Sequence, residues 1–155
     1  MTTKAPRAPL QIGRSSVPRT TGRIALGLAL AFAGTTHLTV ARDEFQAQVP
    51  AWVPVDHDLV VLGSGAVEIT LGVALLAAAK HRVLVGFVVA GFFIAVFPGN
   101  ISQYVTRTDA FGLNTDRDRF IRLLFQPALV VWALWSTGAW QAIRRVWQRR
   151  VRGSS

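Results

Sequence analysis

The chain has 155 residues, of which 51% are apolar, and it carries a formal net charge of +9. It contains no cysteine, which excludes thiolate catalysis, disulfide exchange, iron–sulfur ligation and cysteine–zinc sites within this chain. A basic charge is typical of nucleic-acid binding, but these charges flank apolar segments, so membrane topology accounts for them. We therefore expect no nucleic-acid partner.

The sequence contains four apolar segments of about 20 residues, each long enough to cross a bilayer as a helix. They are nearly free of charge, whereas helices of a soluble bundle carry charged residues on their solvent face. Short connections join them, so one compact membrane domain is expected over residues 19–140. We predict an all-α fold, a four-helix transmembrane bundle with spans at about residues 22–40, 59–79, 83–105 and 120–140.

The charges between these segments predict the orientation of the chain. Most basic residues precede the first segment, lie between the second and third, or follow the fourth. The other two connections contain most of the acidic residues. Because basic connections stay in the cytoplasm, we expect a multi-pass protein with both termini cytoplasmic (N-in/C-in).

The N-terminal residues 1–18 are rich in proline, arginine, serine and threonine and have no hydrophobic periodicity. They predict a disordered basic cytoplasmic arm. Ala31-Phe32-Ala33 in the first segment matches a signal-peptidase pattern, so cleavage there is an alternative to a first span. His37 is either an interfacial histidine bonded to a backbone carbonyl or a member of a polar site.

The connection between the first and second spans contains the stretch Val49-Pro50-Ala51-Trp52-Val53-Pro54. Its two prolines exclude a continuous helix, and its tryptophan is suited to the boundary between membrane and water. We predict a proline-rich cap on the outer side of the bundle.

The second span has Glu68 near its midpoint. Inserting a carboxylate at that depth costs about 3 kcal/mol, so Glu68 is expected to face protein rather than lipid. Ser64 lies one helical turn earlier on the same face. Glu68 is either protonated or paired with Arg122 or His37, and the sequence does not choose among these.

The third span contains Pro98, which removes a backbone donor and releases a carbonyl one turn earlier. Asn100 either satisfies such a carbonyl or contacts a ligand. After the fourth span, residues 141–155 place apolar side chains at roughly helical spacing among arginines. They predict an amphipathic basic tail that lies on an anionic leaflet or stays solvated.

The polar residues inside the four spans fall in the outer half of the bundle when depth is counted at about 1.5 Å per residue. The inner half is mainly leucine, valine and alanine. We predict a polar ligand-binding pocket that opens toward the outer face, with no catalytic set and no metal site. Its predicted members are His37, Ser64, Glu68, Asn100, Gln103, Arg122 and Gln126.

Five short motifs occur in a fixed order along the chain and together resemble the DoxX-like family of small bacterial four-helix integral membrane proteins. The resemblance covers roughly residues 22–140, with Leu124 standing where the family usually has proline. It implies a protein of the bacterial plasma (inner) membrane. The motifs are Ala33-Gly34-Thr35-Thr36-His37, Val49-Pro50-Ala51-Trp52-Val53-Pro54, Ser64-Gly65-Ala66-Val67-Glu68, Pro98-Gly99-Asn100-Ile101 and Arg122-Leu123-Leu124-Phe125-Gln126.

This resemblance implies the membrane subunit of a redox or oxidative-stress assembly, whose pocket receives a quinone head group or a small sulfur species. We expect no covalent cofactor, and the expected partners are the lipid bilayer and other membrane redox proteins that carry the electrons. Whether the chain is itself an enzyme stays open. The alternative is a non-enzymatic scaffold whose polar layer only fixes helix packing. Transport of a proton or small solute is a third function, which the apolar inner half disfavours.

Overall fold

The computed structural model describes residues 15–152, and this part of the chain is all-helical. Residues 1–14 of the predicted arm and the last three residues of the predicted tail lie outside the described residues. The first helix begins earlier than expected, at Val17. The elements are α1 (Val17–Leu38), α2 (Arg42–Gln46), α3 (His57–Ala77), the short 3-10 helix η1 (Ala79–His81), α4 (Arg82–Thr106), α5 (Asp116–Thr137) and α6 (Ala139–Arg152).

Three of these helices are long and apolar enough to cross a membrane, namely α3, α4 together with η1, and α5. The predicted all-helical class with membrane-spanning helices is confirmed in this form. Among the described helices α1 does not reach the same hydropathy. Arg23 lies in its first half and His37 in its last turn, so its apolar centre is shorter.

Local signals set the ends of the helices. The Asp56 side chain accepts hydrogen bonds from the backbone N–H groups of Asp58 and Leu59 and thereby caps α3. Thr115 caps α5 in the same way, through the N–H of Asp118. Gly138 has a φ of 80° and ends α5 in the left-handed conformation that favours glycine.

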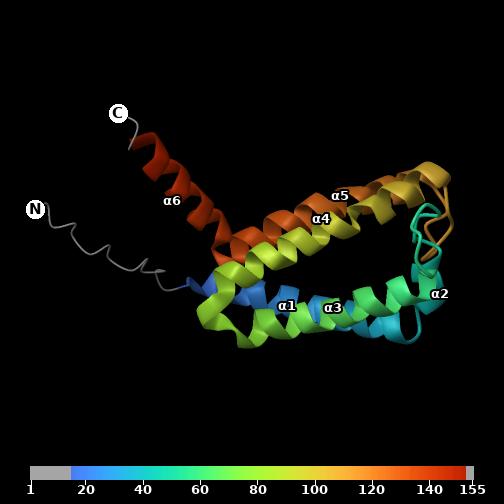
Figure 1. Ribbon diagram of the computed structural model, residues 1–155, viewed down its shortest axis with the longest axis horizontal. Helices are drawn as coiled ribbons and strands as arrows, with labels where there is room; N and C mark the ends of the chain where they lie inside the picture. Colours follow the sequence, from blue (N-terminus) through green and yellow to red (C-terminus); the bar gives the residue numbers. More distant parts are fainter. Residues whose placement is uncertain (1–14, 153–155) are drawn as a thin grey trace, which may run out of the picture.

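The long helices are arranged as two tightly packed pairs, α1 with α3 and α4 with α5 (Figure 1). The pairs diverge from the end where α6 leaves, which we call the α6 end, and α1 also packs against α5. At the opposite end, which we call the α2 end, α2 and the connections 47–56 and 107–115 lie between the pairs.

Glycines allow α1 and α3 to approach closely. A Cβ atom on Gly34 would lie 2.5 Å from the carbonyl oxygen of Gly65. A Cβ on Gly72 would lie 2.6 Å from the carbonyl oxygen of Gly27. The two backbones therefore touch at positions where a side chain would separate them, which is the packing that small residues give membrane helices.

The α6 half of the protein is solidly packed. Arg23 is buried there and donates to the carbonyl of Leu75 in the last turn of α3, one of the carbonyls that a helix end leaves unpaired. The indole Nε1 of Trp132 donates to the carbonyl of Gly22 over 3.0 Å and joins α5 to α1. The buried apolar cluster consists of Leu26, Leu30, Leu71, Leu75, Val89, Ala90, Phe93 and Ala133.

Candidate functional site

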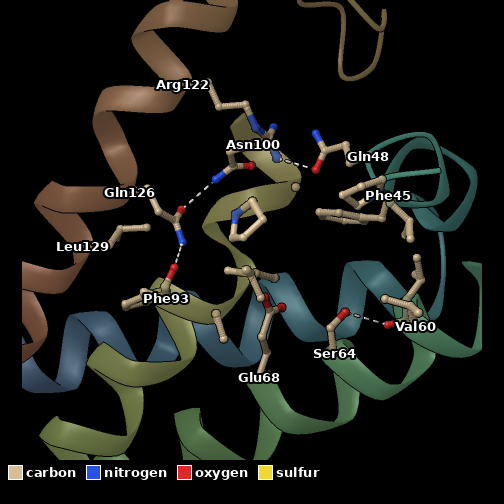
Figure 2. A pocket seen from close by; sticks show the side chains of 18 of the residues that line it. Phe45, Gln48, Val60, Ser64, Glu68, Phe93, Asn100, Arg122, Gln126 and Leu129 are labelled. Carbon is tan, nitrogen blue, oxygen red and sulfur yellow. Dashed lines mark hydrogen bonds between the residues drawn. The ribbon is translucent and has the colours of Figure 1, made fainter. Parts of the chain in front are cut away.

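A cavity of about 420 Å³ lies between the two helix pairs in the α2 half. Its volume falls within the range of small-molecule sites in proteins. All four long helices contribute to its lining, as do Phe45 of α2 and most of residues 48–53 in the connection that follows. Leucine, valine, alanine, proline and phenylalanine side chains make up most of its walls, and a few polar groups enter it from opposite sides (Figure 2).

Ser64 and Glu68 form the polar part of the α3 wall (Figure 2). They lie one helical turn apart and therefore face the same direction. Ser64 donates to the carbonyl of Val61 over 2.9 Å, so its hydroxyl is satisfied within α3. Glu68 is only 9% exposed, and the carboxyl group is thus held in a largely apolar environment.

His37 is the ionisable neighbour of Glu68. Its Nδ1 lies 3.0 Å from Oε2 of Glu68 and 2.9 Å from the carbonyl oxygen of Ala33. A ring nitrogen carries at most one hydrogen. Of the two oxygens near Nδ1, the carbonyl oxygen of Ala33 meets the hydrogen-bond geometry. Oε2 of Glu68 consequently has no aligned hydrogen-bond partner among residues 15–152. His37 thus bonds a backbone carbonyl, one of the two alternatives that the sequence left open, and it also contacts Glu68.

Gln126 and Asn100 form the polar part of the opposite wall, on α5 and α4. Nε2 of Gln126 donates to the carbonyl of Phe93 over 2.6 Å, in the α4 segment just before Pro98. Nδ2 of Asn100 donates to Oε1 of Gln126 over 2.9 Å. Gln126 therefore bonds the α4 backbone one residue before Ile94, whose carbonyl loses its helical donor at Pro98. Asn100 bonds this glutamine.

Arg122 lines the cavity one turn before Gln126 and contacts Gln48 and Phe111, which the sequence did not single out. Its Nη2 donates to Oε1 of Gln48 over 2.8 Å, and Nε2 of Gln48 donates to Oε1 of Gln103 over 2.9 Å. Its guanidinium carbon lies 4.7 Å from the ring centre of Phe111, a cation–π contact. Its Nε is buried without a hydrogen-bond partner in the described part of the chain.

Aromatic rings close the α2 end of the site. Phe45 of α2 stacks on His37 with ring centroids 3.3 Å apart and planes inclined by 16°. Phe111 contacts Phe45 edge-on at 4.6 Å. The rings therefore connect the Glu68 side of the site to the Arg122 side.

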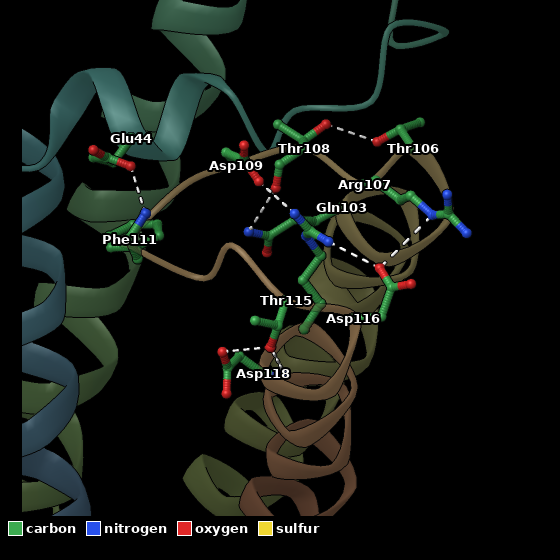
Figure 3. A network of polar contacts seen from close by, with 11 residues as sticks. Glu44, Gln103, Thr106, Arg107, Thr108, Asp109, Phe111, Thr115, Asp116 and Asp118 are labelled. Atoms are coloured by element: carbon green, nitrogen blue, oxygen red, sulfur yellow. Dashed lines mark hydrogen bonds and ion pairs between the residues drawn. The ribbon is translucent and has the colours of Figure 1, made fainter.

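The connection 107–115 that carries Phe111 is anchored by charged groups (Figure 3). Arg119 is buried and pairs with Asp109 and, over 2.9 Å, with Asp116. The backbone N–H of Phe111 donates to Oε2 of Glu44 over 2.5 Å. These contacts hold Phe111 beside Arg122.

Five of the seven predicted pocket residues line the cavity: Ser64, Glu68, Asn100, Arg122 and Gln126. His37 and Gln103 lie behind the lining, where His37 contacts Glu68 and Gln103 contacts Gln48. The sequence analysis missed Phe45 and Gln48, because single residues in a short connection give no periodic signal. Within residues 15–152 no group of three or more His, Cys, Asp or Glu side chains could hold a metal ion.

The fold and the cavity define the class of protein: an all-helical chain with three helices suited to crossing a membrane and a half-polar cavity between helix pairs. The chain belongs to the family described as a domain of unknown function (DUF8561), whose model matches residues 26–137. This match includes every residue that lines the cavity and ends before α6. No curated protein and no solved structure matches the chain.

Proposed function

We propose that the protein is a DoxX-like multi-pass protein of the bacterial plasma membrane, in which α1, α3, α4 and α5 all span the bilayer. The α6 end faces the cytoplasm, and both termini are cytoplasmic. The distribution of charge supports this orientation, because basic connections remain inside. Every acidic residue except Glu68 lies at the α2 end: Asp43, Glu44, Asp56, Asp58, Asp109, Asp116 and Asp118.

The cavity, in this proposal, binds the head group of a quinone, and the protein is the membrane subunit of a redox or oxidative-stress assembly. One observation carries the proposal. The side chains of Glu68 and Arg122 line the cavity from opposite walls, α3 and α5 (Figure 2). Each has one buried atom without a hydrogen-bond partner among the described residues, namely Nε of Arg122 and Oε2 of Glu68, which lies 3.0 Å from Nδ1 of His37. Unpaired buried polar groups are costly, so a ligand that pairs with both would be stabilised.

A quinone head group has the matching chemistry. It is a flat apolar ring with oxygen atoms on opposite sides, which suits a cavity with apolar walls and two separated polar groups. Arg122 would donate to one oxygen, and Glu68 would accept from the hydroxyl of the reduced form. A small sulfur species could pair with Arg122 but would leave the apolar walls unfilled, so it fits less well. Electrons would come from a partner protein.

The proposal can be tested by tryptophan fluorescence, since Trp52 lines the cavity. Protein reconstituted in lipid nanodiscs is titrated with a short-chain quinone and with its reduced form. We expect saturable quenching that disappears in Trp52→Phe and persists in Trp147→Phe, because Trp147 lies in α6, far from the cavity. Glu68→Gln should weaken binding of the reduced form by about tenfold, equivalent to about 1.4 kcal/mol, because one charge-assisted hydrogen bond is lost.

The Arg122→Gln variant provides a complementary test. It should weaken both redox forms, because both carry an oxygen that accepts from Arg122. Quenching that rises linearly with quinone concentration and does not depend on Trp52 would reflect partition into lipid and would overturn the proposal.

A non-enzymatic scaffold is the second candidate function, and one observation favours it. Two chains of side-chain hydrogen bonds already connect the elements of the α2 half: Asn100 through Gln126 to Phe93, and Arg122 through Gln48 to Gln103. Such bonds contribute about 0.6 kcal/mol each in membranes and can serve packing alone. A scaffold would show no saturable quinone binding, and Glu68→Gln would change its thermal stability.

A further inference from the structure

The C-terminal helix α6 leaves the two helix pairs and runs along neither of them (Figure 1). The left-handed Gly138 separates it from α5. Only its first residue, Ala139, is buried. At 1.5 Å per residue its 14 residues extend about 21 Å, too short to cross about 30 Å of hydrocarbon, and several arginines lie along it. We therefore do not expect α6 to be a further membrane-spanning helix.

One face of α6 is apolar and solvent-accessible. Trp140, Ile143, Trp147 and Val151 follow one another at intervals of three or four residues, so they share a face of the helix. Each of these side chains is about half exposed or more, and Trp147 is 67% exposed. Tryptophan is enriched where a protein meets the boundary between membrane and water.

The remaining circumference of α6 is mainly basic. Arg145, Arg149 and Arg152 lie away from the apolar stripe. Arg144 and Arg150 border it on either side, where their long side chains can direct the charge outward. Lys80 and Arg82 lie at the same end of the protein. Among the described residues this end has no acidic side chain. The charge therefore suits an anionic surface.

We propose that α6 is a membrane-surface helix that docks its tryptophan face on an anionic phospholipid leaflet, with its arginines at the level of the head groups. An apolar stripe beside several arginines on a helix too short to span is the pattern of interfacial helices. The inference depends on the membrane placement of α3, α4 and α5, but not on what the cavity binds. Failure of quinone binding and failure of this docking are therefore separate results.

The absence of cysteine permits a direct test on the full-length protein. A nitroxide label is attached at Ile143→Cys on the apolar face or at Gln141→Cys on the opposite face. The protein is reconstituted in vesicles of phosphatidylcholine alone or mixed with phosphatidylglycerol. Electron paramagnetic resonance then compares collisions with oxygen, which concentrates in lipid, and with a nickel chelate, which stays in water.

We expect the label at 143 to collide with oxygen more than with nickel in the anionic vesicles, and the label at 141 to show the reverse. In phosphatidylcholine alone this difference between the two faces should shrink. Arg144→Gln combined with Arg149→Gln should shrink it in anionic vesicles as well. The matched control, Arg107→Gln combined with Arg117→Gln, removes the same charge from the α2 end and should leave the difference intact.

Three results would overturn the inference. Equal nickel access at 143 and 141 would mean that α6 is a solvated tail. Protection of 143 from both reagents would mean that the face is covered by protein. A difference between the faces that is the same in both kinds of vesicle would exclude recognition of anionic lipid. Monodisperse elution of each labelled variant in detergent shows that it has folded before these results are compared.

Discussion

The α6 half and the α2 half of the protein are built from the same four long helices but are packed differently. In the α6 half, leucine, valine and alanine side chains fill the space between the pairs, and basic residues surround the end. In the α2 half, the pairs diverge around a cavity of about 420 Å³ that polar side chains line from opposite sides. The two regions meet at Leu26, Leu30 and Phe93, which belong to the buried core and also line the cavity. A bundle can contain a costly hollow region toward one end when the other end supplies most of the packing.

The largest effect is expected from a substitution that breaks the packed half. A Cβ on Gly86 would lie 1.9 Å from Oγ1 of Thr137, and that hydroxyl is fixed by its bond to the carbonyl of Ala133. Gly86→Ala should therefore lower the free energy of unfolding by about 1–3 kcal/mol, the usual cost of overpacking. Thermal unfolding in detergent, followed by near-UV circular dichroism, measures this change.

Gly91→Ala is the matched control for that experiment, since it lies on the same helix and a Cβ there meets nothing within 4 Å. It should leave stability unchanged or raise it by up to about 1 kcal/mol, through the better helix propensity of alanine. Equal losses in the two variants would mean that the α6 half is not the tightly packed half.

A substitution that fills the cavity in the α2 half should weaken ligand binding and leave thermal stability unchanged. Ala33 lines the cavity from α1, and Ala33→Leu would place extra atoms in the empty space. Thermal stability should be retained, while saturable quinone quenching should weaken at least about tenfold, or about 1.4 kcal/mol. Ala25→Leu, at an exposed position of α1 outside the cavity, should leave quenching unchanged. A loss of stability without a loss of binding would contradict the distinction between the halves.

The smallest effect is expected from the polar links in the α2 half. Gln126→Leu removes the bond to the Phe93 carbonyl and the acceptor for Asn100. Because membrane-helix hydrogen bonds contribute little each, the loss should be about 0.6 kcal/mol per bond in the same unfolding assay. The exposed Gln141→Leu serves as the control and should show no loss. A loss as large as that of Gly86→Ala would make the polar links, rather than the packed half, the main source of stability.

Much of the site could be predicted by counting depth along helices. Ser64, Glu68, Asn100, Arg122 and Gln126 were placed in one layer because helical rise converts sequence position into depth. The partners of these residues could not be predicted in the same way. Gln48 bonds Arg122 from a position 74 residues away. Asn100, a candidate to satisfy a carbonyl released by Pro98, instead bonds Gln126, which donates to the carbonyl of Phe93. Such contacts depend on how helices are rotated about their axes, which hydropathy does not specify.

The amino-acid sequence alone decided three features. These are the four apolar segments, the opposite charges of the connections at the two ends of the bundle, and the acidic residue in the middle of the second segment. Each is a property of composition along the chain. The tertiary structure decided which helices pair, that the pairs diverge, and that His37 rather than Arg122 is the ionisable neighbour of Glu68. Glycine contacts bring α1 against α3, while α2 and its connection lie between the pairs at the other end. The cavity exists because packing between helices, rather than hydropathy within them, determines where space is left.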